Sequence, residues 1–435
     1  MGDYKVYPNK LKGEVKIPPS KSMAHRAVIC AALSNGLCKV TNIDFSDDII
    51  ATVEAMKSLG AVITKKEDYL EIIGIKSSAN KTNDSIDSER TIDCNESGST
   101  LRFLVPIAAL FEGVNRFVGR GNLGKRPLDT YYSIFDEQGI KYSYKEGILD
   151  LKTEGKLKAG EFKVKGNISS QFITGLLFTL PLLDGDSKII ITTEMESKGY
   201  IDLTLSAIKD FGVEIINNNY EEFIIKGNQT YKGRDYRVEG DYSQAAFFLC
   251  GDAVSNEVVV NDLKLDSLQG DKEVIDILER MGVKIKSECN GLIGRADEGL
   301  KATVVDGSQC PDIIPVVSLA ACLCNGITEV INAGRLRIKE CDRLAAVTSE
   351  LNKLGAKITE KEDGLIIEGV SKLKGGCTVW SHKDHRIAMT LAIASTVCEE
   401  PIIIKDYECV SKSYPEFWND FKNVGGVFDE WNVGK

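Results

Sequence analysis

Residues 54–63, Glu-Ala-Met-Lys-Ser-Leu-Gly-Ala-Val-Ile, and the run Leu-Glu-Ile-Ile-Gly at residues 70–74 decide the fold. They predict an amphipathic helix that ends at a glycine, followed by a short strand, a charged turn and a second strand. Gly60 stands just past the helix, where a left-handed backbone is needed that glycine adopts without strain. The pattern returns around Gly139, Gly212, Gly282 and Gly355 and, degraded, at Gly425-Gly426, at intervals of roughly 70 to 80 residues.

A second pattern lies between these copies. It consists of a short strand, a polar loop, a strongly apolar helix, a glycine break and a β-branched strand. We expect such helices over residues 23–33, 100–110, 171–183, 244–253, 312–323 and 386–397. Because they are apolar nearly all round, they should lie in the interior, whereas the amphipathic helices should lie outside. Each repeat therefore reads as βαβαββ, and six repeats predict an α/β protein.

Six repeats divide naturally into two lobes of three. The stretch 227–238 is polar and lies between repeats three and four, and residues 6–17 precede the first repeat. We therefore expect one lobe from residues 20–238 and a discontinuous lobe from residues 1–19 plus 239–435. Lobes of this kind can close on a ligand and exclude water.

The composition is that of an ordinary soluble globular protein. The 435 residues are 43% apolar and 27% charged, which excludes disordered and fibrous classes. No apolar run reaches the roughly 18 residues of a membrane span, and the first residues show no export signal. With 54 Lys plus Arg and 64 Asp plus Glu, the net charge of −10 makes a nucleic-acid binder a poor candidate.

The cysteines favour a reducing compartment. The chain has 12 Cys, mostly in apolar stretches and without a CxxC pair, and only 3 His. A zinc site built from paired ligands is therefore not expected. We expect buried cysteines, no metal and a cytoplasmic location.

Polar loops precede all six apolar helices, at residues 19–26, 95–102, 167–171, 240–244, 308–312 and 381–386. Any single loop can be no more than a helix N-cap, and that reading is favoured for Tyr242-Ser243. Taken together, the loops supply helix N-termini and the cations Lys21, Arg26 and Arg386. This combination suits phosphate and carboxylate groups.

Further cations lie in three other segments: Lys125-Arg126-Pro127, residues 337–343, and Lys412. For Arg337 we favour a solvated helix face. Lys339 and Arg343 are four residues apart, which would put them on one face of a helix. For this pair the residues alone leave structural and functional roles equally open.

The motifs resemble those of the 5-enolpyruvylshikimate-3-phosphate synthase family over essentially the whole chain. They are Pro-Ser-Lys-Ser-Met-Ala-His-Arg (19–26), Glu-Ser-Gly-Ser-Thr-Leu-Arg (96–102), Lys-Arg-Pro-Leu (125–128), Ser-Ser-Gln-Phe (169–172), Ser-Lys-Gly-Tyr-Ile-Asp (197–202), Ile-Lys-Glu-Cys-Asp-Arg-Leu (338–344) and Asp-His-Arg-Ile-Ala-Met (384–389). The resemblance implies the two-lobed enolpyruvyl-transferase fold, an inside-out α/β barrel with three βαβαββ units per lobe. It also implies transfer of the enolpyruvyl group of phosphoenolpyruvate to the 5-hydroxyl of shikimate 3-phosphate, without a cofactor, by a monomer.

The resemblance also assigns residues. The shikimate 3-phosphate set would be Lys21, Ser22, Arg26, Ser169, Ser170, Ser197, Tyr200 and Lys339, with Gln171 where both ligands meet. The phosphoenolpyruvate set would be Gly98, Arg126, Arg343, Arg386 and Lys412, with Lys21 reaching this ligand too and His385 beside Arg386. Asp312 matches the proton acceptor from the 5-hydroxyl, and Glu340 a proton donor to the methylene carbon, with Lys21 as a third catalytic residue.

This inventory suits the chemistry, which needs a base, an acid and cations for a phosphate and a carboxylate. Glu96 and Arg335 depart from the pattern, because many members have Asn at both positions. The family is the target of glyphosate, and Glu96 lies two residues from Gly98.

Two alternative functions are disfavoured. The related transferase that acts on UDP-N-acetylglucosamine carries a Cys before its Arg-Pro pair, but Gly119–Lys125 contains none, and the opening loop has Lys-Ser instead of Lys-Asn. An inactive anion-binding protein on the same fold is disfavoured because Asp312, Glu340 and the cations are all present.

Overall fold

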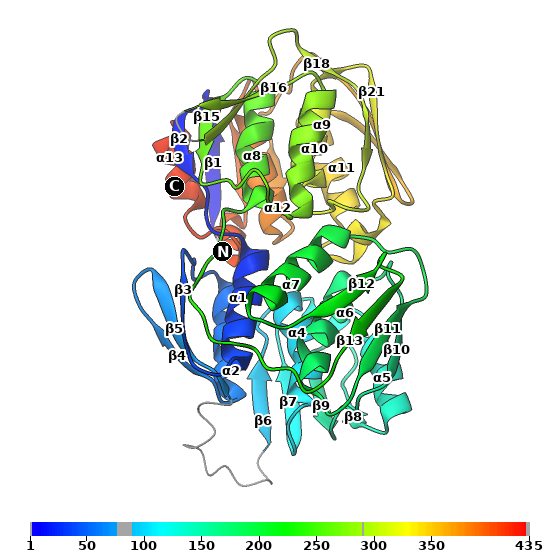
Figure 1. Ribbon diagram of the computed structural model, residues 1–435. Coiled ribbons are helices and arrows are strands. Elements are labelled where there is room, and N and C mark those ends of the chain that lie inside the picture. The colour runs from blue at the N-terminus through cyan, green and yellow to red at the C-terminus, as the bar shows by residue number, and fades with distance from the viewer. Residues whose placement is uncertain (1, 76–88, 289–290, 432–435) are drawn as a thin grey trace. The chain divides into compact units, whose positions relative to one another are not determined.

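The computed structural model describes residues 2–75, 89–288 and 291–431 and has a mixed α/β architecture (Figure 1). The chain divides into two compact units. Unit 1 consists of Met1–Pro18 and Gly240–Lys435, and unit 2 of Pro19–Glu239. Each unit buries its own cluster of apolar side chains, so each has a hydrophobic core.

The described part of unit 2 contains three four-stranded sheets with one connection pattern. In each sheet the first two strands are parallel and the next two pairs antiparallel. In sheet order they are β14 (Tyr236–Arg237), β3 (Leu37–Thr41), β5 (Tyr69–Ile73) and β4 (Val62–Lys65); β6 (Arg90–Asp93), β7 (Val114–Val118), β9 (Asp150–Glu154) and β8 (Lys141–Ser143); β10 (Glu161–Val164), β11 (Ser187–Ile191), β13 (Glu222–Ile225) and β12 (Ile215–Asn218).

The helices of unit 2 fall into two classes, as the sequence predicts. The interior helices are α1 (Lys21–Leu33), α4 (Gly98–Ala108) and α6 (Ser170–Thr179), in which nearly every residue is buried. The amphipathic helices α2 (Asp47–Ser58), α5 (Asp129–Gln138) and α7 (Lys198–Asp210) bury one face. Two 3-10 helices, η1 (Leu123–Lys125) and η2 (Leu180–Leu182), complete the unit as far as it is described.

The sheets of unit 1 repeat the same pattern and include the first strands of the chain. They are β24 (Thr378–Trp380), β25 (Ile402–Lys405), β1 (Asp3–Tyr7) and β26 (Val427–Trp431); β2 (Lys12–Lys16), β15 (Glu257–Asn261), β17 (Gly291–Arg295) and β16 (Lys284–Glu288); β19 (Val304–Asp306), β21 (Ile327–Ile331), β23 (Gly364–Glu368) and β22 (Lys357–Lys361). A small parallel pair joins β18 (Leu300–Lys301) to β20 (Cys324–Asn325).

Three interior helices form the centre of unit 1. They are α8 (Tyr242–Ala253), α10 (Ile314–Cys322) and α12 (His385–Ser395), and each packs against the other two. Figure 1 shows α8 and α10 running side by side. The outer helices are α9 (Glu273–Arg280), α11 (Arg343–Lys353) and α13 (Phe417–Asn423), with the 3-10 helices η3 (Gly270–Lys272), η4 (Gly334–Ile338) and η5 (Tyr407–Lys412). The predicted interior helices are thus confirmed in both units.

The glycines that follow the amphipathic helices adopt the expected backbone conformation. Gly139, directly after α5, has a φ of 70°, and positive φ angles also occur at Gly60, Gly212, Gly282, Gly355 and Gly425. These glycines end their helices and let the chain turn into the next strand. The count of six sequence repeats stays a prediction.

Two composition-based expectations can be compared with the described residues. The 11 cysteines among them are free, and 8 of these are buried, whereas Cys289 lies outside the described residues. Within residues 2–75, 89–288 and 291–431, no helix has the length and hydropathy needed to cross a membrane.

Candidate active site

The residues singled out from the sequence fall into two groups, one in each unit. Unit 1 contains Asp312, Lys339, Glu340, Arg343, His385, Arg386 and Lys412. Unit 2 contains Lys21, Ser22, Arg26, Gly98, Arg126, Ser169, Ser170, Gln171, Ser197 and Tyr200. Each group is drawn from the starts of interior and outer helices and from the loops and 3-10 helices beside them.

Asp312 is the centre of the group in unit 1. Its Oδ1 lies 2.8 Å from Arg343 Nη1 and 3.4 Å from Lys339 Nζ. Its Oδ2 lies 3.2 Å from Arg386 Nη2. One carboxylate therefore contacts three cations, two from the segment 337–343 and one from α12.

Arg343 holds this group together from a fully buried position. Its Nε donates to Asp384 Oδ2 at 2.8 Å, and its Nη2 to Glu340 Oε2 at 2.7 Å. With the bond to Asp312, the planar guanidinium thus bridges three carboxylates, a geometry that only arginine supplies. Desolvation works against the charged form, but the carboxylates outweigh it and raise the pKa of Arg343 well above its usual value.

The charges change the acidity of the neighbouring groups. Burial raises the pKa of Asp312, but Arg386, Lys339 and Arg343 outweigh burial and hold it well below the usual value. Burial lowers the pKa of Lys339, and the positive charge of Arg335 works in the same direction. Asp271, which accepts a hydrogen bond from Ser243 Oγ, has a pKa raised to about 6 by burial and by the charge of Asp312. Asp312 is therefore ionised at neutral pH, and the whole set is electrostatically coupled.

One expectation about local structure in unit 1 is wrong. Lys339 and Arg343 do not share a helix, because η4 ends at Ile338 and α11 begins only at Arg343. Asp342 causes this start, since its side chain caps α11 by accepting from Ala345 N at 3.1 Å. Arg337 lies partly exposed on η4, in keeping with the surface role expected of it, and its Nη1 bonds Asp342 and Glu360 at 2.8 and 2.7 Å.

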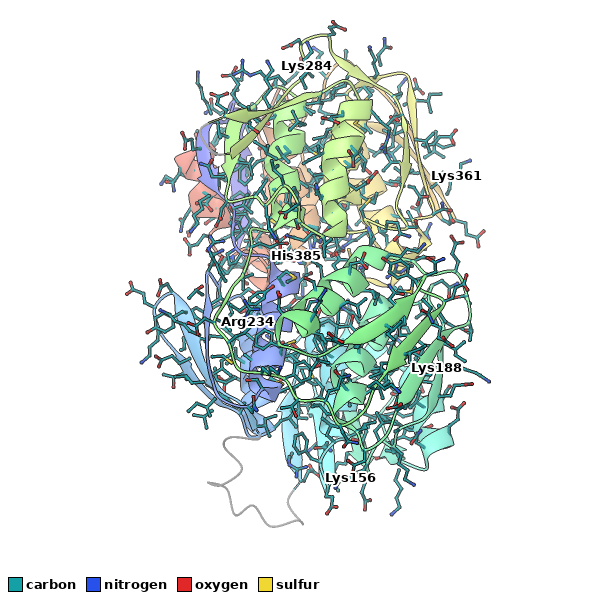
Figure 2. All side chains as sticks on the ribbon, viewed as in Figure 1. Lys156, Lys188, Arg234, Lys284, Lys361 and His385 are labelled. Atoms are coloured by element: carbon teal, nitrogen blue, oxygen red, sulfur yellow. The ribbon has the colours of Figure 1, made fainter. Side chains whose placement is uncertain are left out.

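The start of α12 and the end of η5 supply the remaining members of unit 1. Asp384 caps the helix by accepting from Arg386 N at 2.8 Å, and His385 is the buried first residue of the helix. In Figure 2, Lys284 and Lys361 extend outward from unit 1, as surface lysines usually do, in contrast to His385. Lys412 ends η5, which packs against α12.

In unit 2, Lys21 lies at the first residue of α1 and is mostly buried. Its Nζ forms an ion pair with Asp48 Oδ2 at 3.0 Å, with side-chain exposures of 17% and 10%. Ser20 caps the same helix by accepting from Met23 N. Lys21 therefore stands at the positive end of an interior helix with a carboxylate partner from α2.

Arg26 connects two of the predicted residues, Ser22 and Tyr200, and also bonds Thr204. Its Nη1 donates to Ser22 O at 2.6 Å, its Nη2 to Tyr200 O at 2.7 Å, and its Nε to Thr204 Oγ1 at 2.9 Å. Burial lowers its pKa to about 10, so Arg26 remains charged at neutral pH. The buried Arg26 thereby joins α1 to α7.

Gly98, Arg126 and Gln171 also come together. A Cβ on Gly98 would lie 2.5 Å from Arg126 Nη1 and 3.6 Å from Gln171 Oε1. The Gln171 amide is oriented on both sides, accepting from Arg102 Nη1 at 2.8 Å and donating to Ser99 Oγ at 2.9 Å. The missing side chain of Gly98 thus lets the Arg126 guanidinium reach the N-terminus of α4.

The serines of unit 2 lie at helix starts. Ser169 caps α6 by accepting from Gln171 N at 3.3 Å, and Ser170 is the first residue of that helix. Ser197 precedes α7, is fully buried and has a φ of 55°, and its carbonyl accepts from Tyr200 N at 3.1 Å. A left-handed backbone at a buried serine is uncommon, and such outliers concentrate at functional positions.

A chain of hydrogen bonds links the loop around Lys21 to the loop around Gly98. His25 Nδ1 lies 2.7 Å from Thr52 Oγ1, which lies 2.7 Å from Thr100 Oγ1. Thr100 Oγ1 donates in turn to Ser97 Oγ, the cap of α4, at 2.8 Å. Burial lowers the pKa of His25 to about 3, so the imidazole is neutral and serves this chain as a structural member.

Sequence reasoning missed four residues that complete these groups: Asp48, Arg102, Asp271 and Asp384. Arg102 and Asp384 belong to motifs that the sequence singled out, and Asp384 directly precedes His385 as a helix cap. For Asp48 and Asp271 the sequence carries no comparable signal. Nowhere in the described ranges do three or more His, Cys, Asp or Glu gather so as to hold a metal ion.

Comparison with known proteins gives a family match over nearly the whole chain. A family model described as EPSP synthase (3-phosphoshikimate 1-carboxyvinyltransferase) matches residues 6–421. A 3-phosphoshikimate 1-carboxyvinyltransferase of Clostridium beijerinckii is 82% identical over 435 residues, and one of Clostridioides difficile is 70% identical over 438 residues, with 100% of both chains covered in each case.

Solved structures give the same fold. EPSP synthase from Acinetobacter baumannii has a TM-score of 0.81 and 24% identity, over 99% of this chain and 100% of that chain. The enolpyruvyl transferase NikO from Streptomyces tendae has a TM-score of 0.79 and 14% identity, over 99% of both chains. The enolpyruvyl-transferase fold expected from the sequence is therefore confirmed.

Proposed function

The chain belongs to the EPSP synthase family, and from that premise we propose how its own residues carry the family reaction. The reaction transfers the enolpyruvyl group of phosphoenolpyruvate to the 5-hydroxyl of shikimate 3-phosphate and releases phosphate, a step in aromatic amino-acid biosynthesis. The oxygen of the hydroxyl bonds to the central carbon of phosphoenolpyruvate, the methylene carbon gains a proton, and the phosphate later leaves with loss of that proton. A base, an acid and charge stabilisation are thus required.

Asp312 is the base in this proposal. The observation that carries it is the contact of its carboxylate with Arg343, Lys339 and Arg386, which keeps it ionised and able to accept a proton. A carboxylate so strongly stabilised is a weak base. When the anionic groups of phosphoenolpyruvate bind two of these cations, Arg343 and Arg386, part of that stabilisation is withdrawn and the pKa of Asp312 rises. Ligand binding thus strengthens the base at the moment it is needed.

Glu340 donates the proton to the methylene carbon, and Lys21 assists the transfer. Glu340 Oε2 lies 2.7 Å from Arg343 Nη2, so the same guanidinium orients the acid and the base. We assign Gly98, Arg126, Arg343, His385, Arg386 and Lys412 to phosphoenolpyruvate. Arginine pairs with carboxylate and phosphate in two-pronged geometry, which supports this assignment.

We assign shikimate 3-phosphate to Lys21, Ser22, Ser169, Ser170, Gln171, Ser197, Tyr200 and Lys339. Helix starts with serine hydroxyls and backbone N–H groups suit a phosphate. Arg26 supports this set by donating hydrogen bonds to the backbone carbonyls of Ser22 and Tyr200, which holds both residues in place. The two-point anchoring of Gln171 supports its placement where both ligands meet.

Asp312→Asn tests the central assignment. The amide keeps the shape but cannot accept the proton, so kcat should fall at least about 100-fold while shikimate 3-phosphate binds within about tenfold of wild type. Asp306→Asn is the matched control: Asp306 lies in the same region, but it bonds Ser308 N and Asn332 Nδ2, away from the cations. A kcat for Asp312→Asn within about tenfold of wild type would remove Asp312 from the base role.

We further propose that the enzyme is a cytoplasmic monomer that glyphosate inhibits. The free, mostly buried cysteines of the described residues support a reducing compartment. Cell fractionation and sedimentation of the purified protein test the location and the monomer. Recovery in the membrane fraction or as a stable dimer would contradict this proposal.

A further inference from the structure

Helix α11 is attached twice to the segment Trp380–Asp384, which leads into α12. At its first residue, Arg343 donates to Asp384. Two turns later, Glu350 accepts from Trp380 N at 2.9 Å and lies 2.9 Å from His382 Nε2. Arg343 and Glu350 are seven residues apart and therefore lie on one face of α11. In the first attachment the helix donates through Arg343, whereas in the second it accepts through Glu350.

Glu350 is a buried carboxylate, and its burial requires an explanation. It is 1% exposed, on a helix whose outer face is polar, and buried carboxylates are rare unless paired. Burial raises its pKa, but the hydrogen bonds from His382, Lys353 and Trp380 N outweigh burial and lower the pKa to about 2. Because the carboxylate is ionised, His382 Nε2 must be the donor in the contact between them.

The segment that Glu350 holds has an unusual backbone. His382 and Lys383 have φ angles of 52° and 57°, two consecutive left-handed residues that are not glycine. Such a conformation is strained and persists only where the surroundings impose it. The His382 ring lies against Trp380, with centroids 4.2 Å apart, and Lys383 N donates to Ser381 Oγ at 3.1 Å.

The next residues are those that the reaction needs. Asp384 caps α12 and accepts from Arg343, and Arg386 reaches Asp312. We propose that His382 and Glu350 are positioning residues, which hold the left-handed turn so that Asp384 and Arg386 take their places around Arg343 and Asp312. The proposal rests on the assignment of Arg343 and Arg386 to phosphoenolpyruvate made above.

Two substitutions at one position give the test. A glutamine at 382 puts an amide N–H about where His382 Nε2 lies, whereas an asparagine tolerates the left-handed backbone but falls short of Glu350. His382→Asn should raise KM for phosphoenolpyruvate about fivefold or more, with KM for shikimate 3-phosphate within about twofold of wild type. His382→Gln should restore KM for phosphoenolpyruvate to within about twofold of wild type.

Glu350→Asp is a second variant, in which the shorter side chain withdraws the carboxylate from His382. It should reproduce the effect of His382→Asn. Lys353→Met is the matched control, because Lys353 bonds the same carboxylate at 2.7 Å from the exposed side and should leave both KM values unchanged. Tm is measured for each variant to detect a general loss of stability. Such a loss should raise KM for both substrates equally.

The variant Arg386→Met distinguishes a failure of the positioning role from a failure of the site assignment on which that role rests. If it leaves KM for phosphoenolpyruvate unchanged, the site assignment fails. If it raises that KM but His382→Asn does not, only the positioning role is overturned. The role is also overturned if His382→Gln behaves like His382→Asn, or if both substrates lose affinity equally.

Discussion

At the scale of single residues, Gly98 shows how one missing side chain could shape the site proposed above for phosphoenolpyruvate. It is the first residue of α4, and the space that its side chain would occupy is taken by the guanidinium of Arg126. Gly98→Ala should therefore displace Arg126 and raise KM for phosphoenolpyruvate several-fold. Glyphosate, which resembles an elongated phosphoenolpyruvate, should lose more affinity still.

Michaelis and inhibition constants measured side by side test this expectation. Gly160→Ala is the control, because a Cβ there meets no atom within 4 Å and its backbone requires no glycine. Proportional changes in both constants would mean that Gly98 does not discriminate between the two ligands.

Sequence reasoning predicted which residue types gather in the groups, but not how they are held. The loops before buried helices singled out Lys21, Arg26 and Arg386, whereas Asp312 was named by the family resemblance. Sequence reasoning could not foresee that Arg102 orients Gln171 or that Asp48 pairs with Lys21, since these contacts join distant segments. It also put Lys339 on a helix, because four-residue spacing reads as helical whether or not a cap such as Asp342 intervenes.

At the scale of elements, α11 carries charge that should make its stability depend on pH. The pKa of Glu350 is lowered from 4.5 to about 2 in the folded protein. A group with a lowered folded pKa stabilises the fold above its unfolded pKa, and this contribution is lost as pH falls through the folded value. The stability difference between wild type and Glu350→Gln should therefore be largest above about pH 5 and shrink toward pH 2.

Urea unfolding followed by fluorescence at several pH values measures that difference. Glu368→Gln is the control, because its ion pair with Lys357 is more than half exposed and should contribute little at any pH. A pH-independent difference between wild type and Glu350→Gln would contradict the ionised pairing of Glu350 with His382 and Lys353.

The elements were predicted best where periodicity is strong. The interior helices and the glycine stops follow from local pattern, because burial and backbone geometry act residue by residue. Strand pairing does not follow from local pattern, because β14 pairs with β3, and β1 with β25, across nearly the whole length of each unit. Such register depends on tertiary packing, which a single strand of five residues does not encode.

At the scale of the whole molecule, the formal charge of −10 did not rule out anionic substrates. Three cations converge on Asp312, and most of the described acidic residues lie in ion pairs at the surface or in solvent. A buried cation is screened far less by salt than a surface one, so a few local charges outweigh the net charge. Each unit also has its own hydrophobic core, and these separate cores should affect how the protein unfolds.

All 3 tryptophans, Trp380, Trp418 and Trp431, belong to unit 1, so their fluorescence reports on that unit. Phe178 is fully buried in the core of unit 2, and Phe178→Ala should cost that unit about 3–5 kcal/mol. Since each unit has its own core, we expect this variant to lower the urea midpoint seen by circular dichroism while the tryptophan midpoint stays nearly unchanged. Leu319→Ala, in the core of unit 1, should lower the tryptophan midpoint instead. A shift of both signals together in both variants would show that the two cores unfold as one cooperative structure, because a two-state transition gives coincident curves with every probe.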